Sequence, residues 1–300
     1  MSKRNWALLA ATFVSIIYGV SFTIAKDVMP TFVKPYGFIL LRVLGATVLF
    51  WLVSFFGPKE KIQRSDFPRI IAAALFGVAL NMLTFFKGLS YTSPISGAVI
   101  MVTTPIIVLI LSSILMKERM EARKIIGIFL GLFGTGFLIL YGKSMGSATN
   151  APLGNLLVFI NAVSYGFYLI IVKKLMDKYN AFTFVKWIYT FGLLMVLPFG
   201  WSEYQEIQWQ NLPSVILWEI GFVVVFTTFM TYLLNLVSMR ELKPTTVAVF
   251  IYLQPLFATI FAMSVGKDEL TLVKVLSAVL IFVGVYLVLQ KKKSQSQIKQ

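Results

Sequence analysis

The chain of 300 residues is 58% hydrophobic and only 13% charged, and its mean hydropathy is +0.83. Soluble domains contain about 45–50% apolar and roughly 25% charged residues, so this composition indicates a membrane protein. Cysteine and histidine are both absent, which excludes disulfides, thiolate nucleophiles and the commonest metal ligand. We therefore expect no metal, no cofactor and no catalytic residue.

Apolar runs bounded by charge, proline or glycine predict ten membrane-spanning helices, because about 20 apolar residues cross a bilayer. The predicted spans are 6–26, 36–56, 69–90, 94–116, 123–141, 153–173, 182–202, 215–237, 244–264 and 271–290. The first run lacks an Ala-x-Ala cleavage site, which indicates a retained span and not a signal peptide. The connections are short, so no separate domain outside the membrane is expected.

The net charge of +15 is distributed unevenly over these connections. With the N-terminus in the cytoplasm, nineteen of the 27 lysines and arginines lie on the cytoplasmic side and four lie inside spans. The four on the opposite side are Lys26, Lys34, Lys143 and Lys267. Cytoplasmic loops carry such an excess, so the charge predicts a multi-pass protein of the plasma (inner) membrane with both termini cytoplasmic. The cations form no continuous patch, so nucleic-acid binding is not expected.

An internal repeat relates the two halves of the chain through two offsets. An offset of 147 takes Tyr18 onto Tyr165 and Gly45 onto Gly192, and an offset of 150 takes Pro94 onto Pro244, Pro105 onto Pro255 and Gly134 onto Gly284. Chance similarity between apolar helices is the alternative. Each half holds five spans, an odd number, so the second half enters the membrane from the opposite side. Inverted repeats are typical of secondary transporters with alternating access.

The predicted fold class is thus an all-α polytopic membrane protein with ten transmembrane helices in two inverted five-helix repeats. The predicted domains are a first repeat over 1–145, an inverted second repeat over 150–293 and a cytoplasmic polar tail over 294–300.

Two related motifs carry a resemblance to a known family. The first runs from Tyr91 to Ala98 as YTSPISGA, continues at Thr104-Pro105 and ends at Lys117-Glu118-Arg119; its echo is Lys243 to Ala248, Gln254-Pro255 and Gly266-Lys267-Asp268-Glu269. These motifs resemble the fourth-helix signature of the EamA-like branch of the drug/metabolite transporter superfamily. The resemblance implies a carrier for small polar metabolites, often an exporter of amino acids or similar compounds. It leaves open whether Asp268 or Glu269 matches Glu118.

Polar side chains at similar predicted depth suggest a substrate site near the midplane of the membrane. The candidate substrate-binding residues of this central cavity are Tyr18, Arg42, Asn81, Lys87, Thr104, Asn161, Tyr165, Tyr168, Tyr252 and Gln254. An amide in hydrocarbon requires a partner, which is either another helix or a bound substrate, and both interpretations stand. The tyrosines either stack on the substrate or pack within the protein.

Two cations, Arg42 and Lys87, lie inside the spans of the first half. Either their aliphatic stems carry the charge to the membrane surface, or they present it to a carboxylate or phosphate of the substrate. Pro105 and Pro255 lie near the centres of their spans, where each serves as a hinge or as a fixed kink. The Gly127-x-x-x-Gly131 spacing is compatible with a homodimer or with close helix contact inside one bundle.

Acidic residues are nearly absent from the predicted spans, with Glu219 the exception. A carrier that alternates through a buried carboxylate would place one at mid-depth, so uniport or exchange is expected. The predicted function is a secondary transporter that exports a small organic metabolite, such as an amino acid or a related compound. A noncatalytic membrane subunit and a membrane enzyme for lipid-linked substrates are the alternatives. The expected partners are the small-molecule substrate and the lipid bilayer.

Overall fold

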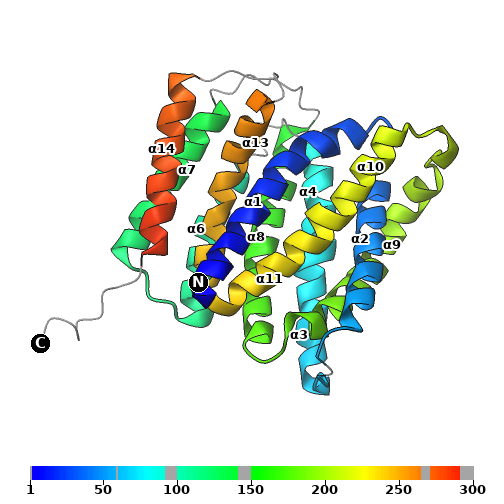
Figure 1. Cartoon of the computed structure of the whole chain (residues 1–300), viewed down its shortest axis with the longest axis horizontal. Helices are drawn as coiled ribbons and strands as arrows, with labels where there is room; N and C mark the ends of the chain where they lie inside the picture. Colours follow the sequence, from blue (N-terminus) through cyan, green and yellow to red (C-terminus); the bar gives the residue numbers. More distant parts are fainter. Residues whose placement is uncertain (1, 59, 92–99, 141–149, 265–270, 291–300) are drawn as a thin grey trace, which may run out of the picture.

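The computed structural model describes residues 2–58, 60–91, 100–140, 150–264 and 271–290, and within these ranges the chain is helical without strands (Figure 1). The first half contributes α1 (Lys3–Val28), α2 (Pro35–Ser54), α3 (Phe67–Ala74), α4 (Leu80–Tyr91), α6 (Thr104–Met116) and α7 (Ala122–Leu140). The second half contributes α8 (Ala151–Met176), α9 (Ala181–Gln205), α10 (Ser214–Phe222), α11 (Thr231–Glu241), α12 (Pro244–Val249), α13 (Leu253–Ser264) and α14 (Leu272–Leu289). The motif residues 92–98, the acidic pair at 268–269 and the tail lie outside the described residues.

Seven helical stretches of the described chain are long and apolar enough to cross a membrane. They are Pro35–Ser54, Arg64–Tyr91, Ala151–Met176, Ala181–Gln205, Ser214–Glu241, Pro244–Phe261 and Leu272–Leu289. The shorter apolar helix α6, together with α1 and α7, runs among them (Figure 1). The protein is therefore an all-helical, multi-pass membrane protein, and the full set of ten spans stays a prediction.

Several of these helices begin at a polar side chain that accepts a backbone hydrogen bond. Ser2, Asn150, Asn180 and Thr271 each accept from an N–H group in the first turn, at 3.2, 3.3, 3.2 and 3.4 Å. The first N–H groups of a helix have no partner inside the helix, so such caps fix where a helix starts.

Two membrane-spanning stretches contain a π-helical segment near their middle. Leu75–Ala79 (η2) interrupts Arg64–Tyr91, and Val223–Met230 (η4) interrupts Ser214–Glu241. The two stretches correspond to each other under the repeat offset of 150 residues: position 64 matches position 214, and position 91 matches position 241. A π-turn widens the helix and shifts its backbone hydrogen bonds, so carbonyl groups at this depth become available to other helices.

The two helices that carry the prolines are interrupted and not merely kinked. The helix at 100–101 gives way to a turn at 102–103 before α6 begins, and a 3₁₀ segment, Phe250–Tyr252 (η5), separates α12 from α13. Pro105 and Pro255 lie in the first turns of α6 and α13. Since an N–H group there has no partner within the helix, proline is accommodated without loss of a hydrogen bond.

The most extensive helix contacts all join the first half of the chain to the second. The pairs are α7 with α14, α2 with α9, α4 with α8, α1 with α13, α1 with α11, and α6 with α8. Figure 1 shows α7 and α14 at one end of the molecule and α2 and α9 at the other, with the remaining helices between them. Each half therefore buries its apolar surface mainly against the other half.

Matched glycines permit this close approach. A Cβ atom at Gly45 of α2 would lie 2.5 Å from Val224 Cγ1, and one at Gly192 of α9 would lie 2.6 Å from Val78 Cγ1. The offset of 147 relates the two glycines, and each valine belongs to the π-helical segment of the other half. The repeat seen in the sequence thus recurs as a pair of similar contacts.

The start of α1 and the end of α14 lie at the same face of the molecule, which we call the termini face (Figure 1). Arg4 Nη2 donates to the carbonyl oxygen of Leu289 at 2.5 Å, and Arg123 donates to the Gln290 side chain at 3.3 Å. At the opposite face, the Asn150 N–H donates to the carbonyl oxygen of Tyr91 at 3.0 Å.

The small-residue face predicted on α7 contacts α14 of the same chain. A Cβ atom at Gly284 would lie 2.6 Å from Gly127 O and 2.6 Å from Gly131 N, both of which are backbone atoms.

We predict that Gly284→Val lowers the free energy of unfolding by about 1–3 kcal/mol, because the backbones must separate. The thermal midpoint of the purified protein in detergent measures this effect. Gly136→Val on α7 is the control, since a Cβ there meets nothing within 4 Å, and an equal loss in both variants would contradict this account.

Candidate functional site

A cluster of aromatic hydroxyl groups surrounds one buried arginine where the two halves meet. We define the central cluster as Tyr18, Arg42, Tyr165, Tyr168, Tyr189 and Tyr232, which come from α1, α2, α8, α9 and α11. The ring centroids of Tyr168 and Tyr232 are 5.9 Å apart, and those of Tyr189 and Tyr232 are 5.1 Å apart. Tyr165 lies 6.0 Å from Tyr168. Residues far apart in the sequence therefore form one continuous group.

Arg42 is the only charged member of the central cluster, and its side chain is buried at 8% exposure. Its Nε donates to Thr228 Oγ1 at 3.1 Å, and its guanidinium carbon lies 5.7 and 5.6 Å from the ring centroids of Phe38 and Phe86. Its electrostatic neighbours are the hydroxyl groups of three cluster tyrosines, Tyr18, Tyr189 and Tyr232. This arrangement points the positive charge into the protein and not toward the membrane surface.

The π-helical segment η2 supplies carbonyl groups to the cluster. The Tyr232 hydroxyl donates to Gly77 O at 2.6 Å, and Ser164 Oγ donates to Phe76 O at 2.7 Å. A Cβ atom at Gly77 would lie 2.1 Å from Tyr168 Cδ2, so only glycine allows this ring to approach the helix. Helices α8 and α11 thus satisfy the carbonyl groups that the π-turn makes available.

Segment η4 and the first residue of α11 contribute threonines to the other side of the cluster. The Thr231 hydroxyl donates to the Tyr18 hydroxyl at 3.1 Å, while Thr227 and Ser21 hydroxyls are 2.5 Å apart. Thr228 Oγ1 donates to Val223 O at 2.9 Å and so presents its lone pairs to Arg42. Segment η4 and the start of α11 thereby present three threonine hydroxyl groups to α1 and α2.

Asn81 and Asn161 join α4 to α8 through reciprocal bonds. Asn161 Nδ2 donates to Asn81 O at 2.7 Å, and Asn81 Nδ2 approaches Asn161 O at 3.4 Å. Asn161 is 2% exposed, and its Oδ1 atom accepts no hydrogen bond from the described residues. The pair therefore makes an interhelical bond and also leaves one buried acceptor available.

Lys87 lies apart from the central cluster, toward the opposite face. Its Nζ is 4.8 Å from the Tyr91 ring centroid and 5.7 Å from that of Tyr36. Glu203 of α9, which accepts from Tyr36 N and Gly37 N at 2.6 and 3.0 Å, is among its electrostatic neighbours. The structure thus separates the two cations that the sequence groups together.

Three further candidates lie on the interrupted helices. Thr104 donates to Met101 O at 2.6 Å. Tyr252 is fully buried in the apolar cluster with α7, where a Cβ at Gly131 would meet its ring at 2.2 Å. Gln254 is half-buried on α13, and its backbone oxygen lies 3.0 Å from the Cβ position of Gly19 on α1. Of these, Gln254 lies beside the segment of α1 that carries Tyr18.

Sequence reasoning missed Tyr189, Tyr232 and the threonines of η4 and α11. The repeat offsets contain a signal for two of them, since 147 takes Arg42 onto Tyr189 and 150 takes Asn81 onto Thr231. Tyr232 has no such signal, because the same offset relates it to Met82. Its role depends on the carbonyl groups of η2, which residue types alone do not reveal.

Polar contacts close both ends of the bundle. At the termini face, Glu118 Oε1 accepts from Lys124 at 2.6 Å, and Glu118 Oε2 accepts from Thr245 at 2.9 Å. At the opposite face, Lys34 forms an ion pair with Glu206 at 2.5 Å, and this bond raises the pKa of Lys34. The bond from Thr245 to Glu118 and the ion pair of Lys34 with Glu206 each join the first half to the second.

Glutamates cap α2 and α9 in a matched way across the halves. Glu203 accepts from the first turn of α2, and Glu60 accepts from Asn180 N and Thr183 Oγ1 at the start of α9, at 2.8 and 2.7 Å. A carboxylate at a helix N-terminus is stabilised by the unpaired N–H groups and the helix dipole. Next to Glu60, Lys178 is bonded to Asp66, which raises the pKa of Lys178.

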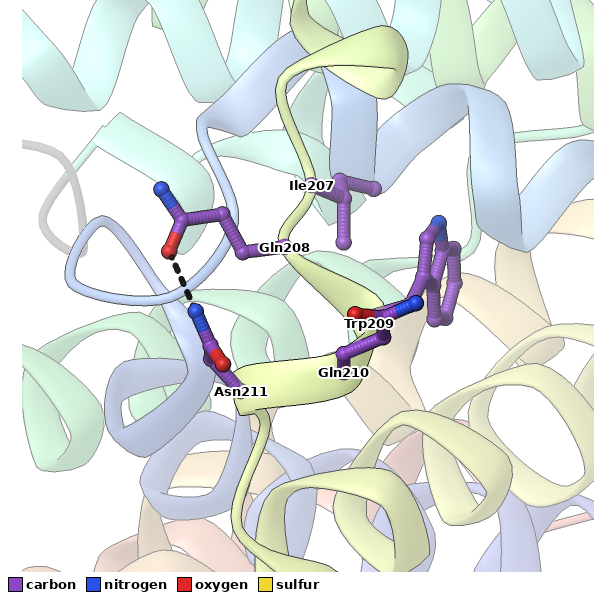
Figure 2. Close-up of a pocket in the computed structure, with 5 residues that line it drawn as sticks. All are labelled: Ile207, Gln208, Trp209, Gln210 and Asn211. Carbon is purple, nitrogen blue, oxygen red and sulfur yellow. Dashed lines mark hydrogen bonds between the residues drawn. The ribbon is translucent and has the colours of Figure 1, made fainter.

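The surface hollow shown in Figure 2 lies away from these residues. Ile207, Gln208, Trp209, Gln210 and Asn211, all in the connection between α9 and α10, line it, and Asn211 Nδ2 donates to Gln208 Oε1 at 3.1 Å. A second hollow lies between α13 and α14. Neither is lined by a member of the central cluster, in which Tyr18 and Tyr165 are half-buried and the other members are buried.

Known proteins resemble this chain over nearly its whole length. An uncharacterized transporter of Archaeoglobus fulgidus is 27% identical over 96% of this chain and 100% of its own length. The uncharacterized transporters YyaM and YetK of Bacillus subtilis are 25% and 23% identical, over 90% and 98% of this chain and 89% of each relative. A solved structure described only as "Crystal structure of protein" has a TM-score of 0.74 at 15% identity, covering 94% of this chain and 96% of that chain, and shows the fold alone.

The family model of the EamA-like transporters matches residues 5–140 and, separately, residues 152–290. This result confirms the family indicated by the motifs around Pro105 and Pro255. The chain therefore belongs to the EamA-like transporter family.

Proposed function

We propose that this protein is a secondary transporter that moves a small organic metabolite across the plasma membrane by alternating access. The observation that carries the proposal is the central cluster, a buried polar group assembled from both halves at the depth of the helix interruptions. Polar groups inside a membrane are tolerated where they line a pathway or a binding site. The names of the relatives support transport and not catalysis.

The proposed architecture is ten membrane-spanning helices in two inverted repeats of five. Three matched features support it: the two π-helical segments, the two interrupted helices and the two glycine contacts of α2 and α9. Because similar halves of opposite orientation can exchange conformations, this symmetry supplies an outward-open and an inward-open state. The contacts of Glu118 and of Lys34 with Glu206 are the bonds that opening toward either face would have to break.

The proposed substrate is an amino acid or a related compound, and the proposed direction is export. Support comes from the mixture of one cation, hydroxyl groups and aromatic rings in the cluster. We assign uniport or exchange to the carrier. The described carboxylates at Asp66, Glu118 and Glu203 are engaged in caps and ion pairs near the two faces.

The proposed orientation places the termini face in the cytoplasm. Because the chain contains no cysteine, a single introduced thiol reports its own position. We predict that an impermeant maleimide labels Gln210→Cys in intact cells but labels Lys61→Cys only after permeabilisation. Both residues are exposed in connections at opposite ends of the bundle. The reverse pattern would contradict the orientation, and labelling of both in intact cells would contradict the topology.

The transport proposal is tested by counterflow in vesicles that contain the purified protein. We expect at least one member of a panel of radiolabelled amino acids and related acids to exchange. Asn161→Leu and Gln254→Leu should lower the rate at least tenfold, because both remove a polar group from the membrane interior. Gln210→Leu, in the surface connection, should exchange at the wild-type rate.

The thermal midpoint of each variant shows whether it is folded. A folded Asn161→Leu protein with unchanged counterflow would contradict this placement of the site. A silent panel with folded wild-type protein would favour the alternative, a noncatalytic membrane subunit, over a carrier of these compounds.

A further inference from the structure

Arg42 holds a positive charge that the described part of the protein does not neutralise. Its Nε atom is bonded to Thr228, and its two terminal nitrogens make no hydrogen bond to the residues that the structure describes. The described salt bridges all involve other cations. Burying a cation inside a membrane protein without a carboxylate partner costs free energy, and residues of this kind usually serve a function.

The residues around Arg42 fix the position of its guanidinium group through Nε and two aromatic rings, without a hydrogen bond from the described residues to its terminal nitrogens. Thr228 accepts from Nε because its own hydroxyl proton is donated to Val223 O within η4. The rings of Phe38 and Phe86 contact the guanidinium through cation–π interactions. Thr228 is thus a positioning residue: it fixes one edge of the guanidinium and leaves the terminal nitrogens for another acceptor.

The charge available at this position is a single positive unit. Lys87, the other cation of the region, has its ammonium group over the rings of Tyr91 and Tyr36, near Glu203. The electrostatic neighbours of Arg42 are tyrosine hydroxyl groups, which are neutral donors and acceptors. A carboxylate carries one negative charge and matches the planar guanidinium in a bidentate pair. A phosphate monoester carries about two charges at neutral pH and would be left partly uncompensated.

We infer that Arg42 is the anchor for a single carboxylate of the transported compound, with Tyr232 and Tyr189 facing the rest of that compound. This inference rests on the proposed function and names the chemical group that the site recognises. It assigns substrate contact to Arg42 and not to Lys87. Tyr232 is held by its bond to Gly77 O, so the ring that faces the site is fixed by the π-turn of the other half.

The test uses small probes and the full-length protein in detergent, so it does not require the substrate to be known. Sodium propionate is compared with propionamide, which has the same shape without the charge, at equal concentration and with chloride matching the ionic strength. We expect propionate to raise the thermal midpoint of the wild-type protein by roughly 2 °C or more and propionamide to have no effect, because a ligand of the folded state stabilises it. Inorganic phosphate is the third probe and should protect less than propionate.

The variants assign the effect to one side chain. Arg42→Gln should abolish the difference between propionate and propionamide, and Arg42→Lys, which keeps the charge but not the bidentate geometry, should restore only part of it. Lys87→Gln is the matched control and should retain the full difference. A wild-type protein that does not distinguish the two probes, an Arg42→Gln protein that still does, or stronger protection by phosphate would each overturn the inference.

The same variants separate this inference from the proposed function. If the wild-type protein shows counterflow but does not prefer a carboxylate over its amide, the proposed transport function stands and the carboxylate anchor is wrong. Protection by propionate without counterflow of any acid would establish the anion site and overturn the transport proposal. Protection and counterflow that both depend on Arg42 support the two together.

Discussion

The structure depends on one constraint: a backbone carbonyl at membrane depth must find a hydrogen-bond donor, because no bulk water is present. The π-helical segments η2 and η4 and the interruptions before α6 and α13 make such carbonyls available at matched positions. Side chains from other helices supply the donors, with Tyr232 and Ser164 serving η2 and Ser15 donating to Phe250 O at 2.9 Å. Polar residues therefore gather where the helices are irregular, and that place is the centre of the molecule.

This constraint also explains why the two halves interlock. The donors come largely from the half of the chain opposite to the carbonyl, as in the bond from α11 to Gly77. The matched glycines on α2 and α9 bring each of these two helices against the π-helical segment of the other half. A rearrangement of one half must then break and remake bonds with the other. The caps by Glu203 and Glu60 and the contacts of Glu118 place similar links at both faces. The result is a fold in which the proposed substrate site and the polar contacts at the two faces belong to the same interface between the halves.

The sequence was sufficient to predict a helical, multi-pass membrane protein, because apolar length and composition are properties of each segment. The ten spans in two inverted repeats stay a prediction. The sequence singled out Asn161 and Arg42 because polar residues within apolar spans are conspicuous; the structure buries both, and their contact with substrate stays a prediction. It did not predict that Pro105 and Pro255 begin new helices, nor that Tyr252 is buried against Gly131 while Tyr189 and Tyr232 surround Arg42. Those outcomes depend on which face of each helix meets another helix, and a tyrosine has no intrinsic preference between an apolar contact and a polar cluster. The π-turns likewise arise from contacts between helices and leave no composition signal in residues 75–79 or 223–230.

Alternating access requires the cluster around Arg42 to reach water from each side of the membrane in turn. Tyr165, a half-buried member of the cluster on α8, provides the most direct measurement, because the chain has no other thiol after Tyr165→Cys. An impermeant maleimide is applied to sealed vesicles of right-side-out and inside-out orientation. Alternating access predicts labelling from both sides, and the rate from each side should fall when transported substrate is present. Labelling from one side alone, or from neither while the unfolded protein is labelled fully, would contradict alternating access through this cluster.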